Sequence, residues 1–339
     1  MTTTFRVLGL LALVAMALVP VLPLGPAQEY IWHVVIQIFL WSFVGNAWSL
    51  MGRFGLVSLG HGAFLGVGAY ATVLLWNFYG MTPWLGVVLA VLLTVALALV
   101  VAYPCSRFQV VGHYFALVTL ALSEVARLVI VALRDQTGGS LGATPNSALH
   151  GGATAAPGAL QFSDKQVWFW IVLAFWLAGL WVWRAVDRSM GRLALQAISE
   201  EEEAAASIGI HVTRAKLRVT MISALMTCAG GVLYAQYQLY VNPDSVSGIA
   251  ISLQMVFGVI AGGMYVMLGP TVGAAFTLLL AEGLRLAFGN RFPALDSTIY
   301  GAMLVLFIIY MPKGILGAAL EVWAKRRAVT APGASPSRT

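Results

Sequence analysis

The sequence predicts an all-α integral membrane protein, a polytopic helical bundle of about ten transmembrane spans with both termini in the cytoplasm. Of its 339 residues, 60% are hydrophobic and 9% are charged, and the mean hydropathy is +0.87. Soluble chains carry about 25% charged residues. Apolar runs of about 20 residues, enough for a helix to cross a bilayer, recur along the chain. Lys and Arg residues gather between alternate runs, which indicates a fixed orientation.

In chain order, the apolar runs predict spans at 7–24, 30–50, 54–76, 84–104, 111–133, 167–184, 218–240, 249–267, 270–288 and 296–311. With the N-terminus inside, fourteen of the nineteen Lys and Arg residues fall in cytoplasmic segments, four fall outside, and Arg127 lies within a span. Because cytoplasmic loops collect Lys and Arg, this bias predicts an N-in, C-in topology. The first run has the length of a signal peptide, but no clear small-residue cleavage site follows, so we expect a retained helix.

The charge and cysteine content argue against several other classes of protein. The net charge of +6 and the pI near 9.5 are explained by topology, so we expect no nucleic-acid partner. Cys105 and Cys228 lie at or inside predicted spans without metal-ligand spacing, which is typical of packing residues. The chain has no Walker-type phosphate loop, Ser-His-Asp or Cys-His arrangement, or metal-ligand cluster. We therefore expect neither enzymatic chemistry nor a cofactor.

Three non-membrane segments complete the organisation. Residues 1–327 are expected to form one transmembrane domain, and 328–339, AVTAPGASPSRT, a disordered cytoplasmic tail. The external loop 134–166 is rich in Gly, Ala, Ser and Thr and serves either as a linker or as a contact surface for an external partner. The cytoplasmic segment 187–217 is the long polar interruption between the two halves of the chain.

Within that segment, GRLALQAISEEEEAAASIGIHVTRAKLR predicts a short helix over 200–208. Ser199 and Glu202 have the spacing of a capping box, and carboxylates in the first turn favour the helix dipole. Gly209 is suited to end the helix. A helix of about nine residues is too short to be stable alone, so we expect it to dock onto another surface.

The third span contains closely spaced glycines and two polar side chains, Ser58 and His61. A G-x-x-x-G pair at Gly62 and Gly66 allows either close helix packing or a break in the helix at a cavity, and we favour packing. His61 is expected to be a hydrogen-bonded packing residue, because no acidic partner for a proton relay is adjacent. The glycines of this stretch are Gly55, Gly60, Gly62, Gly66 and Gly68.

The fifth span carries charges at membrane depth. Glu124 and Arg127 share one helix face at i and i+3 and can neutralise each other, either as a structural ion pair or beside a transport path. Thr119 lies near the same stripe, and Asn46 is a buried polar candidate in the second span. The candidate pathway or gating residues are Asn46, Ser58, Gly60, His61, Gly62, Thr119, Glu124 and Arg127.

The second half of the chain repeats two of these features. AGGMYVMLGPTVGAAF gathers glycines around a tight cytoplasmic turn, where Pro270 can begin the ninth span. Glu282 and Arg285 form another i, i+3 pair near the outer end of that span.

Several blocks of sequence resemble a known family. NAWSLMGRFGLVSLGHGAFLGVGAYAT resembles the signature of branched-chain amino-acid ABC-transporter permeases. HYFALVTLALSEVARL, GRLALQAI, EEEAAASIGIHVTRAKL and YGAMLVLFIIYMPKGILG follow in the order and spacing of that family, from about residue 40 to residue 317. The HYFALVTLAL block favours the LivM-like over the LivH-like subunit.

The resemblance implies a transmembrane permease subunit of an ATP-driven importer in the bacterial inner membrane. Such permeases work with a second homologous permease, two cytoplasmic ATP-binding subunits and an external solute-binding protein, surrounded by membrane lipid. ATP hydrolysis is expected on the partner subunits, and the expected cargo is a branched-chain or related amino acid.

The resemblance also assigns the cytoplasmic helix a coupling role. Importer permeases carry an E-A-A-x-x-x-G pattern followed by I-x-L-P, and Glu203, Ala204, Ala205 and Gly209 match its first part. The second part differs, because VTMI occupies 219–222 and the proline is missing. We expect the alanines to allow close approach of the ATPase, Glu203 to pair with one of its basic residues, and Gly209 to turn the chain.

Three alternatives remain open. Related permeases carry urea, short-chain amides or other small organic solutes, and the residues named above do not distinguish the cargo. A secondary transporter would need a coupling-ion site, which is disfavoured by the scarcity of acids within the spans, where only Glu124 and Glu282 are candidates. A structural scaffold would leave the coupling segment unexplained.

Overall fold

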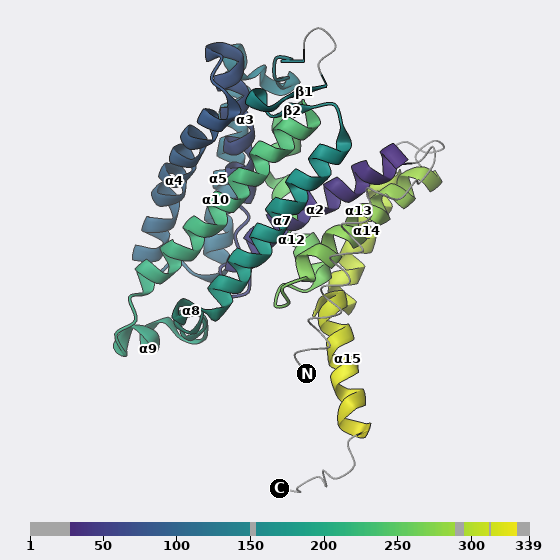
Figure 1. Ribbon diagram of the computed structural model, residues 1–339. Coiled ribbons are helices and arrows are strands. Elements are labelled where there is room, and N and C mark those ends of the chain that lie inside the picture. Colours follow the sequence, from purple (N-terminus) through teal and green to yellow (C-terminus); the bar gives the residue numbers. More distant parts are fainter. Residues whose placement is uncertain (1–27, 150–153, 289–294, 312, 331–339) are drawn as a thin grey trace, which may run out of the picture.

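The computed structural model describes residues 28–149, 154–288, 295–311 and 313–330, which are mostly helical (Figure 1). The long helices are α2 (Gln28–Gly52), α3 (His61–Tyr79), α4 (Pro83–Arg107), α5 (Gly112–Ala132), α7 (Lys165–Arg188), α8 (Met190–Glu200), α10 (Val212–Gln238), α12 (Ile249–Gly262), α13 (Gly269–Phe288), α14 (Leu295–Tyr310) and α15 (Gly314–Thr330). The short elements are α6 (Arg134–Thr137), η3 (Gly139–Leu141), β1 (Ala155–Ala156), η4 (Pro157–Ala159), β2 (Gln161–Phe162), α9 (Glu202–Ser207) and α11 (Pro243–Val246). The two strands pair antiparallel, with Ala155 opposite Phe162.

Seven helical stretches among the described residues are long and apolar enough to cross a membrane. They are Gln28–Gly52, His61–Tyr79, Pro83–Arg107, Gly112–Ala132, Lys165–Arg188, Val212–Gln238 and Pro243–Gly262. This confirms the predicted all-α membrane fold. The count of ten and the N-in, C-in orientation stay predictions. The expected span 7–24 lies outside the described residues. Of the tail expected to be disordered, 328–339, residues 328–330 belong to helix α15 and the rest lies outside the described residues. Helices α13 and α14, at the last two expected spans, are not among the seven.

Three predicted spans differ from the structure by five residues or more. The span expected at 218–240 begins at Val212, so the first turns of α10 lie in the segment that was expected to be cytoplasmic. The span expected at 54–76 begins only at His61, because Gly55 has a φ of 77° and residues 53–60 form a loop. The indole of Trp48 holds this loop by donating to the carbonyl oxygen of Ser58 at 2.7 Å. The span expected at 249–267 ends at Gly262, because the chain turns at Gly263, where φ is 112°.

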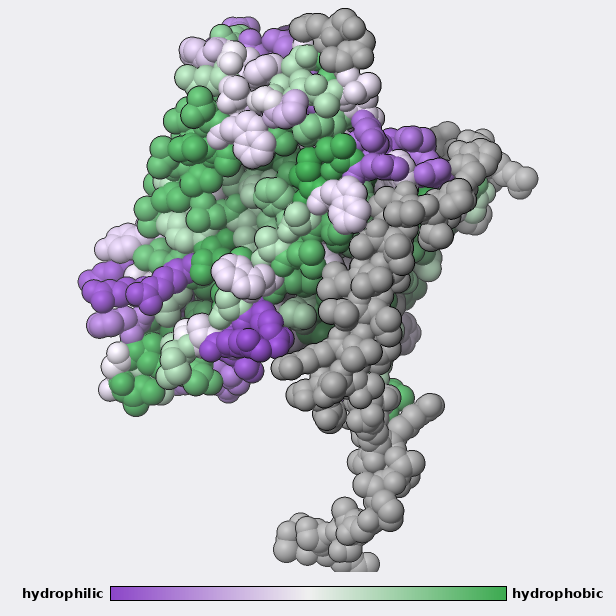
Figure 2. Space-filling view, viewed as in Figure 1, coloured by the Kyte–Doolittle hydropathy of each residue, from purple (hydrophilic) through white to green (hydrophobic). Residues whose placement is uncertain are grey.

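Helix α2 forms the centre of the bundle and packs against α7, α10, α12 and α13. Phe39, Leu40 and Val44 are among its buried side chains. Helices α4 and α5 instead expose many apolar side chains, and Figure 2 shows hydrophobic residues over the middle of the molecule with hydrophilic ones nearer its ends. An apolar outer surface is expected where lipid is the solvent.

Cys105 and Cys228 are both buried and free, in agreement with the predicted packing role.

The two ends of the bundle carry different structures (Figure 1). At one end, here called the loop end, the segment from α6 to β2 folds against the bundle, where Ala143 pairs with Val241. At the same end Lys165, the first residue of α7, bridges to Glu29 of α2 at 2.9 Å. Trp76 donates its indole N–H to the carbonyl oxygen of Asn146 at 2.8 Å. Helices α8 and α9 lie at the opposite end, here called the coupling end.

Backbone-to-backbone contact joins α3 and α10. A Cβ atom at Gly68 would lie 2.1 Å from the carbonyl oxygen of Cys228, and one at Gly231 would lie 2.1 Å from that of Leu65. No side chain larger than hydrogen fits at either position, since real Cβ contacts are much longer. Small residues permit this approach between helices in membranes.

The glycines that the sequence singled out lie in the same kind of contact. Gly62 and Gly66 are packed against other elements: their Cβ positions would lie 2.7 Å from Ser123 Oγ and 3.1 Å from Ser247 Cβ. The expectation of close packing at this pair is confirmed. The predicted tight turn between α12 and α13 is also present, and a Cβ at Gly262 would lie 1.8 Å from the carbonyl oxygen of Gly269.

We predict that Gly68→Ala lowers the stability of the purified protein by about 1–3 kcal/mol, because the added methyl group forces α3 and α10 apart. The matched control is Gly283→Ala, which also adds one methyl to a helical glycine but meets nothing within 4 Å. The control should be neutral or slightly stabilising through helix propensity. Thermal unfolding in detergent checks both variants, and equal midpoints would contradict the close contact.

Candidate functional site

The coupling end is built on two helices separated by one extended residue. Helix α8 ends at Glu200, Glu201 is extended with φ −154° and ψ 109°, and α9 runs from Glu202 to Ser207. The prediction of a single helix over 200–208 is therefore wrong at its start, because Glu200 belongs to α8 and the following helix begins only at Glu202. The capping box is absent because the Ser199 hydroxyl donates to the carbonyl oxygen of Gln196, inside the last turn of α8.

The end of α9 agrees with the sequence. Gly209 has a φ of 88°, its N–H donates to the carbonyl oxygen of Ala206 at 3.0 Å, and the N–H of Ile210 donates to that of Ala205 at 3.2 Å. These two bonds form a Schellman motif, which ends a helix with a residue in the left-handed region. Gly209 is suited to this position because it has no Cβ atom to strain the backbone.

The four residues of the E-A-A-x-x-x-G pattern differ in their exposure. Glu203, Ala204 and Gly209 are exposed, whereas Ala205 is only 2% exposed and faces the protein itself. The resemblance predicts that Ala205 allows close approach of another protein. In this structure its side chain is covered by the chain itself, so the residues of the pattern that lie open are Glu203, Ala204 and Gly209.

An ion pair anchors α9 to α10. The Lys216 ammonium donates to the Glu202 carboxylate, and the two side chains are 5% and 14% exposed. Attraction between charges is much less screened in such a site than on an open surface. The Glu202 carboxylate thus holds α9 to the bundle instead of capping it.

A second charge cluster links the coupling end to the loop at 53–60. Arg53 donates to Asp187 at 3.0 Å and stacks over the ring of Trp183, with 4.1 Å between its guanidinium carbon and the ring centroid. Arg192 lies 3.5 Å from the same carboxylate. Burial lowers the pKa of Arg53, and the neighbouring Asp187 raises it. Because Arg53 and Asp187 are far apart in the chain, sequence spacing did not indicate this cluster.

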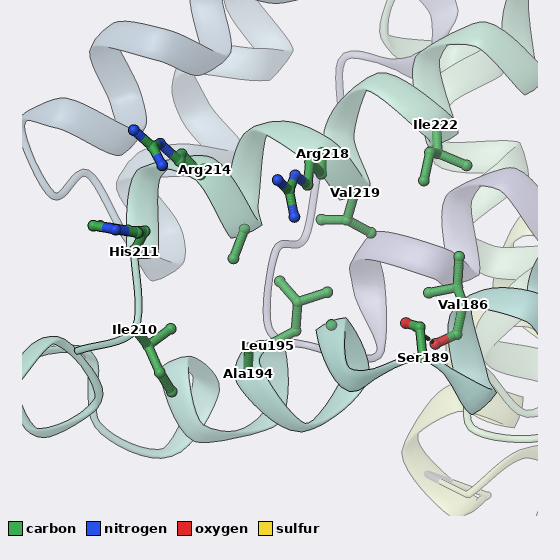
Figure 3. A pocket seen from close by; sticks show the side chains of 12 residues that line it. Val186, Ser189, Ala194, Leu195, Ile210, His211, Arg214, Arg218, Val219 and Ile222 are labelled. Carbon is green, nitrogen blue, oxygen red and sulfur yellow. Dashed lines mark hydrogen bonds between the residues drawn. The ribbon is translucent and has the colours of Figure 1, made fainter. Parts of the chain in front are cut away.

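A groove of about 470 Å³ lies between α8 and α10, beside α9 (Figure 3). We call it the α8–α10 groove. Apolar side chains such as Leu195, Val219 and Ile222 line it, and Arg214 and Arg218 stand on its α10 wall. Among the described residues, neither guanidinium has a carboxylate within ion-pair distance. The groove therefore combines an apolar floor with uncompensated positive charge.

Three of the predicted pathway residues, Ser58, His61 and Gly62, form buried polar contacts at the start of α3. His61 is fully buried between Ser223, 2.8 Å from Nε2, and Ser58, 3.2 Å from Nδ1. The Ser223 hydroxyl donates to the carbonyl oxygen of Ala47, so Nε2 of His61 is the donor to Ser223. The N–H of Gly62 donates to Ser252 Oγ at 3.0 Å. These contacts agree with the predicted packing role of His61.

Gly60 and Thr119 meet at the junction of the 53–60 loop with α5. A Cβ at Gly60 would lie 2.8 Å from the carbonyl oxygen of Thr119, and Thr119 Oγ1 accepts from the N–H of Leu59 at 3.0 Å. Both residues therefore hold the loop to α5. Asn46 stands apart: it is fully buried in α2, and its amide has no hydrogen-bond partner among the described residues.

The predicted Glu124–Arg127 pair is present at 2.8 Å and is extended by Asp244 of α11, which lies 3.3 Å from Arg127. Arg127 thus joins α5 to the loop end, which supports its structural interpretation. The other expected i, i+3 pair, Glu282 with Arg285, is also present at 2.7 Å.

In the described part of the chain, no group of three His, Cys, Asp or Glu side chains is arranged to hold a metal.

Comparison with known proteins identifies the family. The sequence profile described as "Branched-chain amino acid transport system / permease component" matches residues 30–308. The chain belongs to this family. The permease is a multi-pass membrane transport protein of the LivM-like type, in agreement with the resemblance found in its sequence. No solved structure matches it.

Two relatives have the name "High-affinity branched-chain amino acid transport system permease protein LivM", one from Salmonella typhimurium and one from Escherichia coli. Each is 30% identical to the permease over 285 residues, which cover 79% of this chain and 65% of the relative. The permease therefore spans less than two thirds of the length of these relatives. A LivH permease protein from Salmonella typhimurium is 23% identical over 307 residues, which cover 86% of this chain and 97% of the relative.

We predict that Lys216→Met releases α9 from the bundle, because it leaves the Glu202 carboxylate partly buried without a counter-charge. Removing one partner of such a pair costs about 3 kcal/mol. Hydrogen–deuterium exchange of the α9 amides should therefore be about 100-fold faster than in the wild type. The double variant Lys216→Met/Glu202→Gln removes both charges and should recover most of the protection. Unchanged exchange in the single variant would show that Ala205 alone holds the helix.

Proposed function

We propose that the permease is a transmembrane subunit of an ATP-driven importer for branched-chain or related amino acids, located in the bacterial inner membrane. Membership of the family and the names of the LivM and LivH relatives support this function. In this proposal the coupling end faces the cytoplasm, where the predicted topology gathers the basic residues.

The proposed assembly contains four further subunits. A LivH-like permease completes the channel, two cytoplasmic ATP-binding subunits supply energy, and an external solute-binding protein delivers the cargo. Separate ATP-binding subunits are supported by the resemblance to importer permeases, and this sequence has no Walker-type phosphate loop of its own.

The observation that carries the coupling proposal is the two-sided character of α9. One side is held to the bundle by Ala205 and the Glu202–Lys216 pair, while the other presents Glu203 and Ala204 to the outside. A partner that binds the exposed side therefore pushes on a helix that is fixed to α10. Glu203 is free to pair with a basic residue of the ATPase, as the sequence resemblance implies.

The α8–α10 groove gives the same partner a second point of attachment. An apolar side chain of the ATPase fits its floor, and an adjacent carboxylate would meet Arg214 or Arg218. Contacts on both sides of the Gly209 turn would move α9 and the start of α10 together.

Reconstitution in liposomes tests the function and separates the alternatives. With the LivH-like permease, the ATPases and the binding protein, uptake of labelled leucine should require ATP and the binding protein. Uptake of urea or a short-chain amide in place of leucine would show that the importer carries a different solute. Uptake driven by a proton or sodium gradient without ATP would overturn the importer class.

We predict that Gly209→Leu reduces ATP-dependent uptake at least tenfold while the protein stays in the membrane. A leucine at a φ of 88° costs about 1–2 kcal/mol and displaces the turn between α9 and α10. The space at Gly209 is open, so the effect comes from backbone conformation and not from a clash. Gly209→Asn is the control, because asparagine tolerates this conformation. If Gly209→Asn loses as much uptake as Gly209→Leu, the backbone conformation at this turn is not the cause of the loss.

We predict that Ala204→Arg prevents binding of the ATPase subunit, because the long side chain blocks close approach to the exposed side of α9. Ala204→Ser should bind normally, since serine is nearly as small. Co-purification of the ATPase with each variant checks this. Normal ATPase binding by Ala204→Arg would show that the partner docks elsewhere.

A further inference from the structure

A polar cleft of about 380 Å³ lies at the loop end, between α2, α10, α11, α12 and α13. This is within the range of about 300–1,000 Å³ that small-molecule sites occupy. It lies at the opposite end of the bundle from α9, and none of the residues singled out for the pathway lines it. The residues that carry the argument are Gln37, Trp41, Gln254, Leu278, Glu282 and Arg285.

Three amide side chains line the cleft, and none of them forms a hydrogen bond to another described residue: those of Gln37, Gln254 and Gln238 at the end of α10. Gln37 of α2 is 9% exposed and Gln254 of α12 is half-buried. The polar atoms of these amides are not enclosed by protein, unlike those of Asn46 and Gln236, so they reach the open space of the cleft. Each amide offers both N–H donors and a carbonyl acceptor. All three are therefore available to a polar ligand or to water.

The mouth of the cleft holds charges of both signs. Glu282 accepts from Arg285 at 2.7 Å and also from the hydroxyl of Tyr30, and Asp244 lines the same mouth from α11. A ligand with one cationic and one anionic group a few ångströms apart finds complementary charges here. A neutral solute such as urea would leave this charge pattern unused.

One wall of the cleft is apolar. Val34 and Trp41 of α2 face Ile251 of α12 and Leu278 of α13 across the cleft, and the ring of Tyr234 packs edge-on against Trp41. An aliphatic side chain fits this wall without leaving a polar group unpaired.

The cleft continues inward as a much narrower space. A gap of about 20 Å³ shares Trp41, Gln254 and Leu278 with the cleft and extends to Gly45 and Gly258. Such a volume has room for about one water molecule. The cleft is therefore open at the loop end and constricted further inside, at small residues of α2 and α12.

We propose that this cleft is a binding site for a zwitterionic α-amino acid with an aliphatic side chain. Arg285 and the amides of Gln37 and Gln254 bind the carboxylate, Glu282 and Asp244 bind the ammonium group, and the side chain lies against Trp41 and Leu278. The site lies within one subunit, and it rests on the proposed function as an amino-acid importer.

Leucine protection of an introduced cysteine tests the site in the complete transporter. Gln238 lines the cleft at the end of α10 and is not assigned to a ligand group. Gln238→Cys, in a background with both native cysteines replaced by alanine, should react with a water-soluble methanethiosulfonate reagent. Leucine should slow that reaction, and urea should not. Gln236→Cys is the control, because Gln236 is 1% exposed on α10 and does not line the cleft. Its labelling should be slow and independent of leucine.

Uptake measurements complete the test. Gln37→Leu and Gln254→Leu should each slow leucine uptake about tenfold, the effect of losing one hydrogen bond to a charged group, while Gln236→Leu takes up leucine normally. If the wild type takes up leucine but leucine does not protect Gln238→Cys, the site is overturned and the proposed function is not. A wild-type transporter that does not import leucine would overturn the proposed function itself. Uptake rates are compared only among variants that assemble with their partner subunits. The cysteine-protection experiment does not use the substitutions of glutamine by leucine, so it tests the site independently.

Discussion

The contact between the backbones of α3 and α10 is the constraint on which the rest of the structure depends. Gly68 and Gly231 place each helix against a carbonyl oxygen of the other, so no flexible side chain lies between them. The polar contacts of His61 with Ser223 lie at this same interface. Two helices joined in this way move as one body, because packed interiors have low compressibility.

Helix α10 extends this rigidity from one end of the permease to the other. It begins just after Gly209 at the coupling end, carries Lys216 beside α9, and ends at Gln238 beside the loop-end cleft. In the proposed importer, the ATPase acts at the first end and the solute arrives at the second. A single helix that touches both sites offers a direct mechanical connection, provided that two arrangements of α10 exist.

The sequence predicted the features that depend on local spacing. The apolar runs located most of the helices, the i, i+3 rule found the Glu124 and Glu282 pairs, and Gly209 marked the end of α9. Features that depend on distant residues were missed. Ser223 lies 162 residues from His61, and Gln37 and Gln254 share a cleft only because α2 and α12 meet. Glu202 was assigned to a cap because its partner, Lys216, becomes its neighbour only after the chain turns at Gly209.

The spans of the permease are unequal in length, and this decides which of them reach the lipid headgroups. Helix α3 has 19 residues and α4 has 25, so they measure about 28 Å and 37 Å along their axes. A hydrocarbon layer of about 30 Å matches α3, and it also matches the apolar part of α4, which ends before Pro104. The last turn of α4 therefore extends beyond the hydrocarbon layer. Its exposed Arg107 lies at the depth of the headgroups, where a guanidinium can pair with lipid phosphate.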